Sequence, residues 1–228
     1  MSSSRLAVDG PRPDVVLFDA GGTLVLIDPD RFNAFTAKWD QPAVQPDRLF
    51  DAHFRAMSEY SDRLDAGGPL EFRWWADRFF ELVELSLTER MANAFGGGRN
   101  MWSSPIPGAR ETVRDLVGRG YRVAVVSNSD GTVAEALDSA GFGGLFEAVI
   151  DSTEVGISKP DPAIFRIALE ELGVAASATW YVGDSHYHDI GGARAAGLAA
   201  AVLVDPLALG PPDQLSVRSI TELPDLLA

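Results

Sequence analysis

The chain has 228 residues, of which 46% are hydrophobic and 23% are charged, a composition typical of a globular protein with a substantial core. It contains no cysteine, which excludes disulfides, thiolate metal sites and cysteine nucleophiles. The formal charge of −14 argues against nucleic acid and anionic membranes as partners, but allows an anionic substrate if a bound cation reverses the field in one pocket.

The first residues, MSSSRLAVDGPRP, lack the apolar segment of a signal peptide. No apolar run approaches the roughly 20 residues that a membrane-spanning helix requires. We therefore expect a cytoplasmic protein.

The first predicted strand is VVLF at 15–18, and it is followed at once by DAGGT at 19–23. Its apolar residues are continuous, which is typical of a strand buried on both faces of a parallel sheet. A single carboxylate, Asp19, therefore stands where this strand ends.

About a hundred residues without a clear strand follow. They contain three amphipathic segments, 30–40, 47–64 and 70–95, that predict helices. We expect these helices to form a small cap domain, 27–104, inserted into a core made of 1–26 and 105–228. Such a cap would exclude water and complete a pocket, and Trp102 near its end is a candidate for the pocket entrance.

The rest of the chain alternates strands and helices. Helical spacing of apolar residues occurs at 109–120, 132–142 and 161–174. Further strands are predicted at 122–127 (RVAVVS), 147–150 (EAVI), 179–184 (TWYVGD) and 200–204 (AAVLV). This alternation predicts an α/β fold with a doubly wound parallel sheet of the Rossmann-like type.

Polar residues gather at the predicted strand ends and at the helix start in SKPDP. They are Asp19, Ser127, Asn128, Lys159, Asp184 and Asp189. In an open parallel sheet, ligands bind beyond the carboxyl ends of the strands. Lysine, hydroxyl and backbone amides can hold phosphate oxygens, and a hard cation held by few carboxylates and by substrate oxygens is the usual arrangement of Mg²⁺.

Four motifs in this order, DAGGT, VAVVS, SKPDP and GDSHYHD, resemble those of the haloacid dehalogenase superfamily, most members of which are phosphatases. The resemblance spans about residues 14–205, and the insertion matches the cap position of one large subgroup. It implies a Mg²⁺-dependent phosphoric monoester hydrolase that acts on a small phosphorylated metabolite.

The resemblance also implies a role for each matching residue. Asp19 would attack phosphorus to form an aspartyl-phosphate, which water then hydrolyses. Ser127 and Lys159 would assist catalysis and, together with Asn128, would bind the phosphate. The implied metal ligands are Asp19, Gly21 through its backbone carbonyl, Asp184 and Asp189.

Gly21 departs from the pattern of the superfamily's phosphatases. Those enzymes normally carry a second aspartate at this position, which protonates the leaving group and later activates water. General acid–base assistance is worth roughly 10²–10⁴-fold, so its loss slows the departure of a poor leaving group and matters little for a good one.

Three explanations remain open. One is a phosphate or phosphonate enzyme whose leaving group needs no acid, or whose acid is relocated to His186, His188, His53 or Lys38. The branch that cleaves phosphonoacetaldehyde uses a cap lysine as a Schiff base, but the surroundings of Lys38 do not match the motif of that branch. Alternatively, the chain is a phosphate-binding or regulatory protein with little turnover. Finally, it is a metal-independent 2-haloacid dehalogenase, although such an enzyme does not need the two aspartates of GDSHYHD. The substrate and the choice between monomer and homodimer stay open as well.

Overall fold

A six-stranded parallel sheet lies at the centre of the computed structural model, which describes residues 12–96 and 101–227. Its strand order is β5-β4-β1-β6-β7-β8, which confirms the predicted doubly wound fold. The strands are β1 (Val15–Phe18), β4 (Arg122–Ser127), β5 (Val149–Asp151), β6 (Thr179–Gly183), β7 (Ala200–Val204) and β8 (Ser216–Val217). The two-residue β8 is too short to give a sequence signal.

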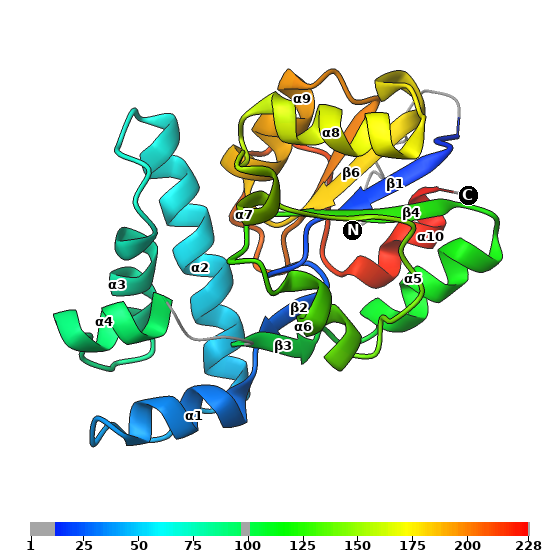
Figure 1. Ribbon diagram of the computed structural model, residues 1–228. Helices are drawn as coiled ribbons and strands as arrows, with labels where there is room; N and C mark the ends of the chain where they lie inside the picture. Colours follow the sequence, from blue (N-terminus) through cyan, green and yellow to red (C-terminus); the bar gives the residue numbers. More distant parts are fainter. Residues whose placement is uncertain (1–11, 97–100, 228) are drawn as a thin grey trace, which may run out of the picture.

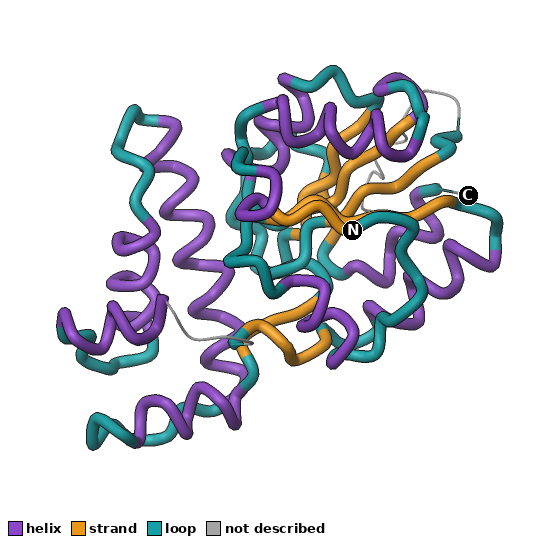
Figure 2. Tube along the Cα trace, viewed as in Figure 1, coloured by secondary structure: helices purple, strands orange, loops and turns teal. Residues whose placement is uncertain are grey.

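Helices cover both faces of this sheet, which Figure 2 shows as one layer of strands between helices. One face carries α5 (Ala109–Gly118), α6 (Val133–Ser139) and α10 (Leu223–Leu226), and the other carries α8 (Pro162–Leu172) and α9 (Gly192–Ala195). Short turns of helix complete the core at Ser152–Val155 (α7), Ala176–Ala178, His186–Gly191 and Ile220–Glu222.

The strand β1 is packed from both sides. Successive side chains of a strand point to opposite faces, so Val16 and Phe18 enter one hydrophobic core while Val15 and Leu17 enter the other. All four are fully buried. This two-sided burial explains the unbroken apolar sequence that predicts the strand.

Four further helices form a separate group beside the sheet (Figure 1). They are α1 (Pro29–Ala37), α2 (Pro46–Asp65), α3 (Phe72–Leu82) and α4 (Glu89–Gly96). Their apolar faces meet around Phe32, whose ring centroid lies 5.7 Å from that of Phe79, 5.5 Å from that of Phe80 and 6.3 Å from that of Phe95. The helices therefore have a hydrophobic core of their own.

The predicted helical segment 70–95 is two helices, because the chain turns through Glu84 with a positive φ of 59°. The boundaries of the cap at 27 and 104 stay a prediction, which the separate core of these helices supports. In the part of the chain that the structure describes, no helix combines the length and the apolar character needed to cross a membrane.

Two short antiparallel strands, β2 (Val25–Ile27) and β3 (Trp102–Pro105), connect the cap to the sheet. No strand is predicted between β1 and β4, and this prediction is wrong. The reason is physical: each strand has three or four residues, and each finds its partner far away along the chain. The pairing of Leu26 with Ser104 places the entry and the exit of the cap side by side.

Candidate active site

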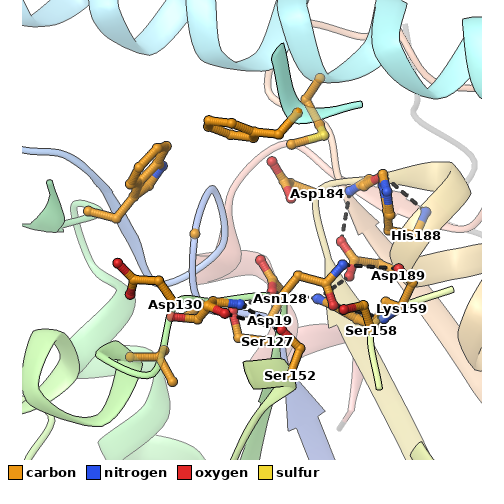
Figure 3. Close-up of a pocket in the computed structure, with 18 of the residues that line it drawn as sticks. Asp19, Ser127, Asn128, Asp130, Ser152, Ser158, Lys159, Asp184, His188 and Asp189 are labelled. Carbon is orange, nitrogen blue, oxygen red and sulfur yellow. Dashed lines mark hydrogen bonds and ion pairs between the residues drawn. The ribbon is translucent and has the colours of Figure 1, made fainter. Parts of the chain in front are cut away.

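The predicted polar residues meet at one edge of the sheet. Asp19 directly follows β1, Ser127 ends β4 and Asp184 directly follows β6. Because β1 lies between β4 and β6, these three positions are neighbours at the crevice where the strand order reverses. Lys159 comes from the loop before α8, and Asp189 from the helical turn after β6, so that both lie beside Asp19 (Figure 3).

Lys159 lies at the centre of this site and is only 2% exposed. Its Nζ donates to Oδ1 of Asp19 at 2.6 Å and to Oδ1 of Asp189 at 2.6 Å. Burial alone would lower the pKa of Lys159, but the carboxylates of Asp189 and Asp19 outweigh burial and hold this pKa above its usual value. One charged ammonium therefore pairs with two buried carboxylates.

Tyr181 on β6 supports the lysine, and it was not recognised from the sequence. Its hydroxyl accepts from Lys159 Nζ at 2.9 Å and reaches the carbonyl of Val126 at 2.9 Å and Oδ1 of Asp189 at 3.1 Å. A tyrosine within a fully buried apolar strand needs a partner for its hydroxyl. That requirement was the available signal in TWYVGD.

Asp19 carries the carboxylate that would act as nucleophile. Its Oδ1 also accepts a hydrogen bond from the hydroxyl of Ser127 at 3.2 Å. Burial raises the pKa of Asp19 to about 7, against the effect of Lys159 and with a further contribution from Asp189 and Asp184. At neutral pH the site thus needs more positive charge than Lys159 supplies to keep Asp19 fully ionised.

The donor atoms for a metal ion are close together. Oxygen atoms of Asp19, Asp184 and Asp189 all lie within 4.8 Å of one another. Three carboxylates and one ammonium leave a formal charge of −2 when all are ionised, which a divalent cation would neutralise. An all-oxygen set of this kind is what Mg²⁺ prefers, so the residues present fit that ion.

The first loop approaches Asp184 closely at Gly22. A Cβ atom at this position would lie 2.0 Å from Oδ2 of Asp184, and the φ of Gly22 is +82°. Both features require glycine. The loop of DAGGT and the loop of GDSHYHD can therefore share one small site.

Asn128 fixes the loop that carries Lys159. Its Nδ2 donates to the carbonyl of Lys159 at 3.0 Å, and the N–H of Lys159 donates to its Oδ1 at 2.8 Å. Both Nδ2 and Oδ1 of Asn128 are already hydrogen-bonded to Lys159, so the backbone N–H of Asn128 is the group that would make its predicted phosphate contact.

The cap reaches the site through His53 of α2. Its Nε2 lies 2.8 Å from Oδ2 of Asp184, and both side chains are buried. Burial raises the pKa of Asp184, and the hydrogen bond with His53 partly offsets this rise. Among the described residues, Nδ1 of His53 has no hydrogen-bond partner. His53 is thus a link between the cap and a predicted metal ligand.

The other candidates for a relocated acid fit less well. His188 lines the site, but burial lowers its pKa to about 4, so the imidazole is neutral at pH 7 and is a poor proton donor. His186 binds Asp65 and Asp62 of α2 at 3.1 and 3.3 Å and does not line the cavity of Asp19. Lys38 is exposed and lies outside that cavity too.

A cavity of about 470 Å³ extends from these groups to the cap. Asp19, Ser127, Lys159 and the two other aspartates line its polar end. Its apolar lining includes the cap residues Met57, Tyr60, Leu70, Phe72, Trp75 and Met101 together with Trp102. Trp102 therefore contributes to the pocket, as its position near the end of the insertion indicates.

A model of the haloacid dehalogenase-like hydrolases matches residues 13–197. The chain belongs to this family. As a haloacid dehalogenase-like hydrolase, it is an enzyme, and the resemblance of its four motifs to this superfamily is confirmed.

Two relatives and one solved structure illustrate the range of the family. The haloacid dehalogenase-like hydrolase domain-containing protein 3 of Bos taurus is 31% identical over 188 residues, which cover 78% of this chain and 75% of the relative. A phosphoglycolate phosphatase of Pseudomonas fluorescens is 30% identical over 209 residues, which cover 89% and 74%. The crystal structure of a dehalogenase superimposes with a TM-score of 0.64 at 25% identity, covering 97% of this chain and 99% of that one.

Proposed function

We propose that this hydrolase is a magnesium-dependent phosphatase that acts on a small phosphorylated metabolite without the usual second aspartate. The observation that carries the proposal is the charge arrangement at the site. Asp19, Asp184 and Asp189 place their oxygens within 4.8 Å of one another, and among the described residues Lys159 is the ammonium that pairs with Asp19 and Asp189. Such a cluster suits a divalent cation followed by an anionic substrate.

Asp19 would be the nucleophile. Lys159 and Ser127 both hold its Oδ1, whereas Oδ2 accepts no hydrogen bond from the residues that the structure describes. That second oxygen would attack phosphorus and form an aspartyl-phosphate. Water would then release inorganic phosphate and restore the carboxylate.

The remaining residues would bind and orient. Lys159, the hydroxyl of Ser127 and the backbone N–H of Asn128 would hold the phosphoryl oxygens. Asp19, the backbone carbonyl of Gly21, Asp184 and Asp189 would hold Mg²⁺, which when bound would stabilise negative charge that develops between carboxylate and phosphate.

The two other functions predict different behaviour. A dehalogenase releases halide without a metal, and it would leave Asp184 and Asp189 as two buried carboxylates with no catalytic task. A phosphate-binding protein would retain the ligand contacts and have no turnover, in agreement with the missing acid at Gly21. The phosphoglycolate phosphatase among the relatives supports phosphate chemistry.

The test measures phosphate release from acetyl phosphate and p-nitrophenyl phosphate, and chloride release from 2-chloropropionate, each with Mg²⁺ and with EDTA. We expect phosphate release that requires Mg²⁺ and is lost in Asp19→Asn. Asp14→Asn is the matched control, because Asp14 is exposed at the other end of β1. Phosphate release that Asp19→Asn retains, or chloride release that EDTA does not affect, would refute the proposal.

The proposal carries several predictions about context. The expected partner is a small phosphorylated molecule, with neither nucleic acid nor membrane involved. The expected location is the cytoplasm, and the expected state is a monomer or a homodimer.

A further inference from the structure

An aromatic ring closes the site at the position of the missing acid. A Cβ atom on Gly21 would lie 3.3 Å from Cδ1 of Trp102. A side chain at this position would therefore begin in contact with an indole ring. Trp102, which also lines the cavity, therefore places an apolar ring against Gly21.

Trp102 belongs to a cluster of three rings that line the cavity. Its centroid lies 5.9 Å from that of Trp75 and 6.3 Å from that of Phe72. Phe72 and Trp75 stack on each other at 5.3 Å. Separations of this size are favourable for aromatic pairs, so the three rings pack together. Trp75 is only 1% exposed, so the accessible ring surface belongs to Phe72 and Trp102.

Part of this surface is left open. Phe72 is 49% exposed and Leu70 is 58% exposed, although both side chains line the cavity. Apolar surface of this kind, rimmed by polar groups at the phosphate end, is typical of a ligand site. A hydrophobic ligand that covered it would gain about 25 cal/mol for each Å² removed from water.

The chemistry of the leaving group leads to the same kind of molecule. An alkoxide that leaves without a proton is a strong base, with a conjugate acid near the pKa of water, about 15.7. A phenolate is a far weaker base, since a phenol such as the tyrosine side chain has a pKa of about 10. A phosphate ester of a phenol therefore reacts readily at a site that lacks a general acid.

We propose that the substrate is the phosphate monoester of a phenol, whose ring packs against Phe72 and Trp102. This inference rests on the proposed phosphatase function. In the first step Asp19 forms a bond to phosphorus, the bond from phosphorus to the phenolic oxygen breaks, and the electron pair leaves on the phenolate. The phenolate takes a proton from solvent, and water cleaves the aspartyl-phosphate to inorganic phosphate and free Asp19.

Three substrates separate the parts of the proposal. Phenyl phosphate has the ring and the good leaving group. Benzyl phosphate has the same ring, but its leaving group is an alkoxide. Acetyl phosphate has a good leaving group and no ring. With the Mg²⁺-loaded enzyme, we expect kcat/KM for phenyl phosphate to exceed that for benzyl phosphate by at least roughly 10²-fold, which is the lower end of the value of a general acid. We also expect a lower KM for phenyl phosphate than for acetyl phosphate.

Two substitutions at Gly21 test the cause of this preference. Gly21→Asp introduces the acid and should raise kcat/KM for benzyl phosphate at least tenfold relative to phenyl phosphate. Gly21→Ala is the matched control, because it creates the same contact with Trp102 without a carboxyl group. Phe72→Ala should raise the KM for phenyl phosphate more than it raises the KM for acetyl phosphate.

Three other results of these experiments would each refute one part of the proposal. Similar kcat/KM values for phenyl and benzyl phosphate would show that another residue, such as His53, supplies the proton, and would refute the choice of a phenol. A KM for phenyl phosphate that is not lower than the KM for acetyl phosphate would refute the binding of an aromatic ring. If none of the three compounds is cleaved, the phosphatase function itself is refuted, which distinguishes the two levels of the proposal.

Discussion

Replacing Lys159 by methionine should destabilise the metal-free protein severely. The change removes the ammonium that lies 2.6 Å from both Asp19 and Asp189 and leaves two buried carboxylates without their cation. Breaking a buried ion pair by removing one partner costs roughly 3–5 kcal/mol. We expect a loss of this size in the free energy of unfolding, measured by urea denaturation in EDTA at pH 8.

The chain provides a matched control for this experiment. Lys38, the other of its two lysines, is exposed, so Lys38→Met makes the same chemical change at a site without buried carboxylates. Its effect should stay within about 0.5 kcal/mol. Similar losses for the two variants would refute the argument that Lys159 offsets the charge of the site.

The destabilisation should also depend on pH. In the wild type, burial raises the pKa of folded Asp19 to about 7, above the value of 3.8 for an unperturbed side chain. The stability that such a group contributes is fully present below pH 3.8 and is lost as the pH rises through 7. Lys159 lowers this pKa, so without the lysine the loss continues above pH 7. The difference between the two proteins should therefore be larger at pH 8 than at pH 6, and a constant difference would contradict this account.

Three further predictions concern the metal site, a histidine and the cap. Mg²⁺ at a hundred times its Kd should stabilise the wild type by about 2.7 kcal/mol, and Asp184→Asn should lose most of this gain in urea denaturation. Burial lowers the pKa of His188 to about 4. The stability that neutral His188 contributes is therefore present above its usual pKa of 6.5 and is lost as the pH falls through 4. In His188→Gln, the free energy of unfolding should rise less between pH 4 and 6.5 than in the wild type, by at most about 3 kcal/mol. Phe32→Ala should cost roughly 3–5 kcal/mol because it opens the aromatic core of the cap, whereas Phe72→Ala at a half-exposed position should cost about 1 kcal/mol in the same assay.

Each of these predictions has an outcome that contradicts it. Full stabilisation of Asp184→Asn by Mg²⁺ would place the ion elsewhere. An unchanged pH slope in His188→Gln would mean that the wild-type imidazole titrates normally. Equal losses for the two phenylalanine variants would contradict a cap core centred on Phe32.

The sheet and the polar end of the site could be predicted from sequence for one physical reason. Strands buried on both faces are apolar throughout, and parallel strands place their carboxyl ends at one edge. The residues that end β1, β4 and β6 therefore had to meet. This reasoning finds Asp19, Ser127 and Asp184 without any knowledge of the side-chain geometry.

Contacts between distant helix faces could not be predicted in the same way. The amphipathic pattern of α2 shows that one face is buried, but not that His53 on this face meets Asp184. In the sequence, Tyr181 is one more residue of a predicted strand, and only the structure shows that its hydroxyl contacts Lys159. The pairing of β2 with β3 depends on two short segments whose separation along the chain hides their relation.

The ribbon of β2 and β3 gives the cap a single point of insertion. Because Ile27 pairs with Trp102, the two ends of the inserted segment are adjacent, and a different segment could replace it without a change in the threading of the sheet. Such a replacement would also replace Leu70 and Phe72, because both lie in the inserted segment. Trp102 would stay, since it belongs to the ribbon. The proposed binding surface would therefore combine Phe72 of the exchangeable segment with Trp102 of the retained ribbon.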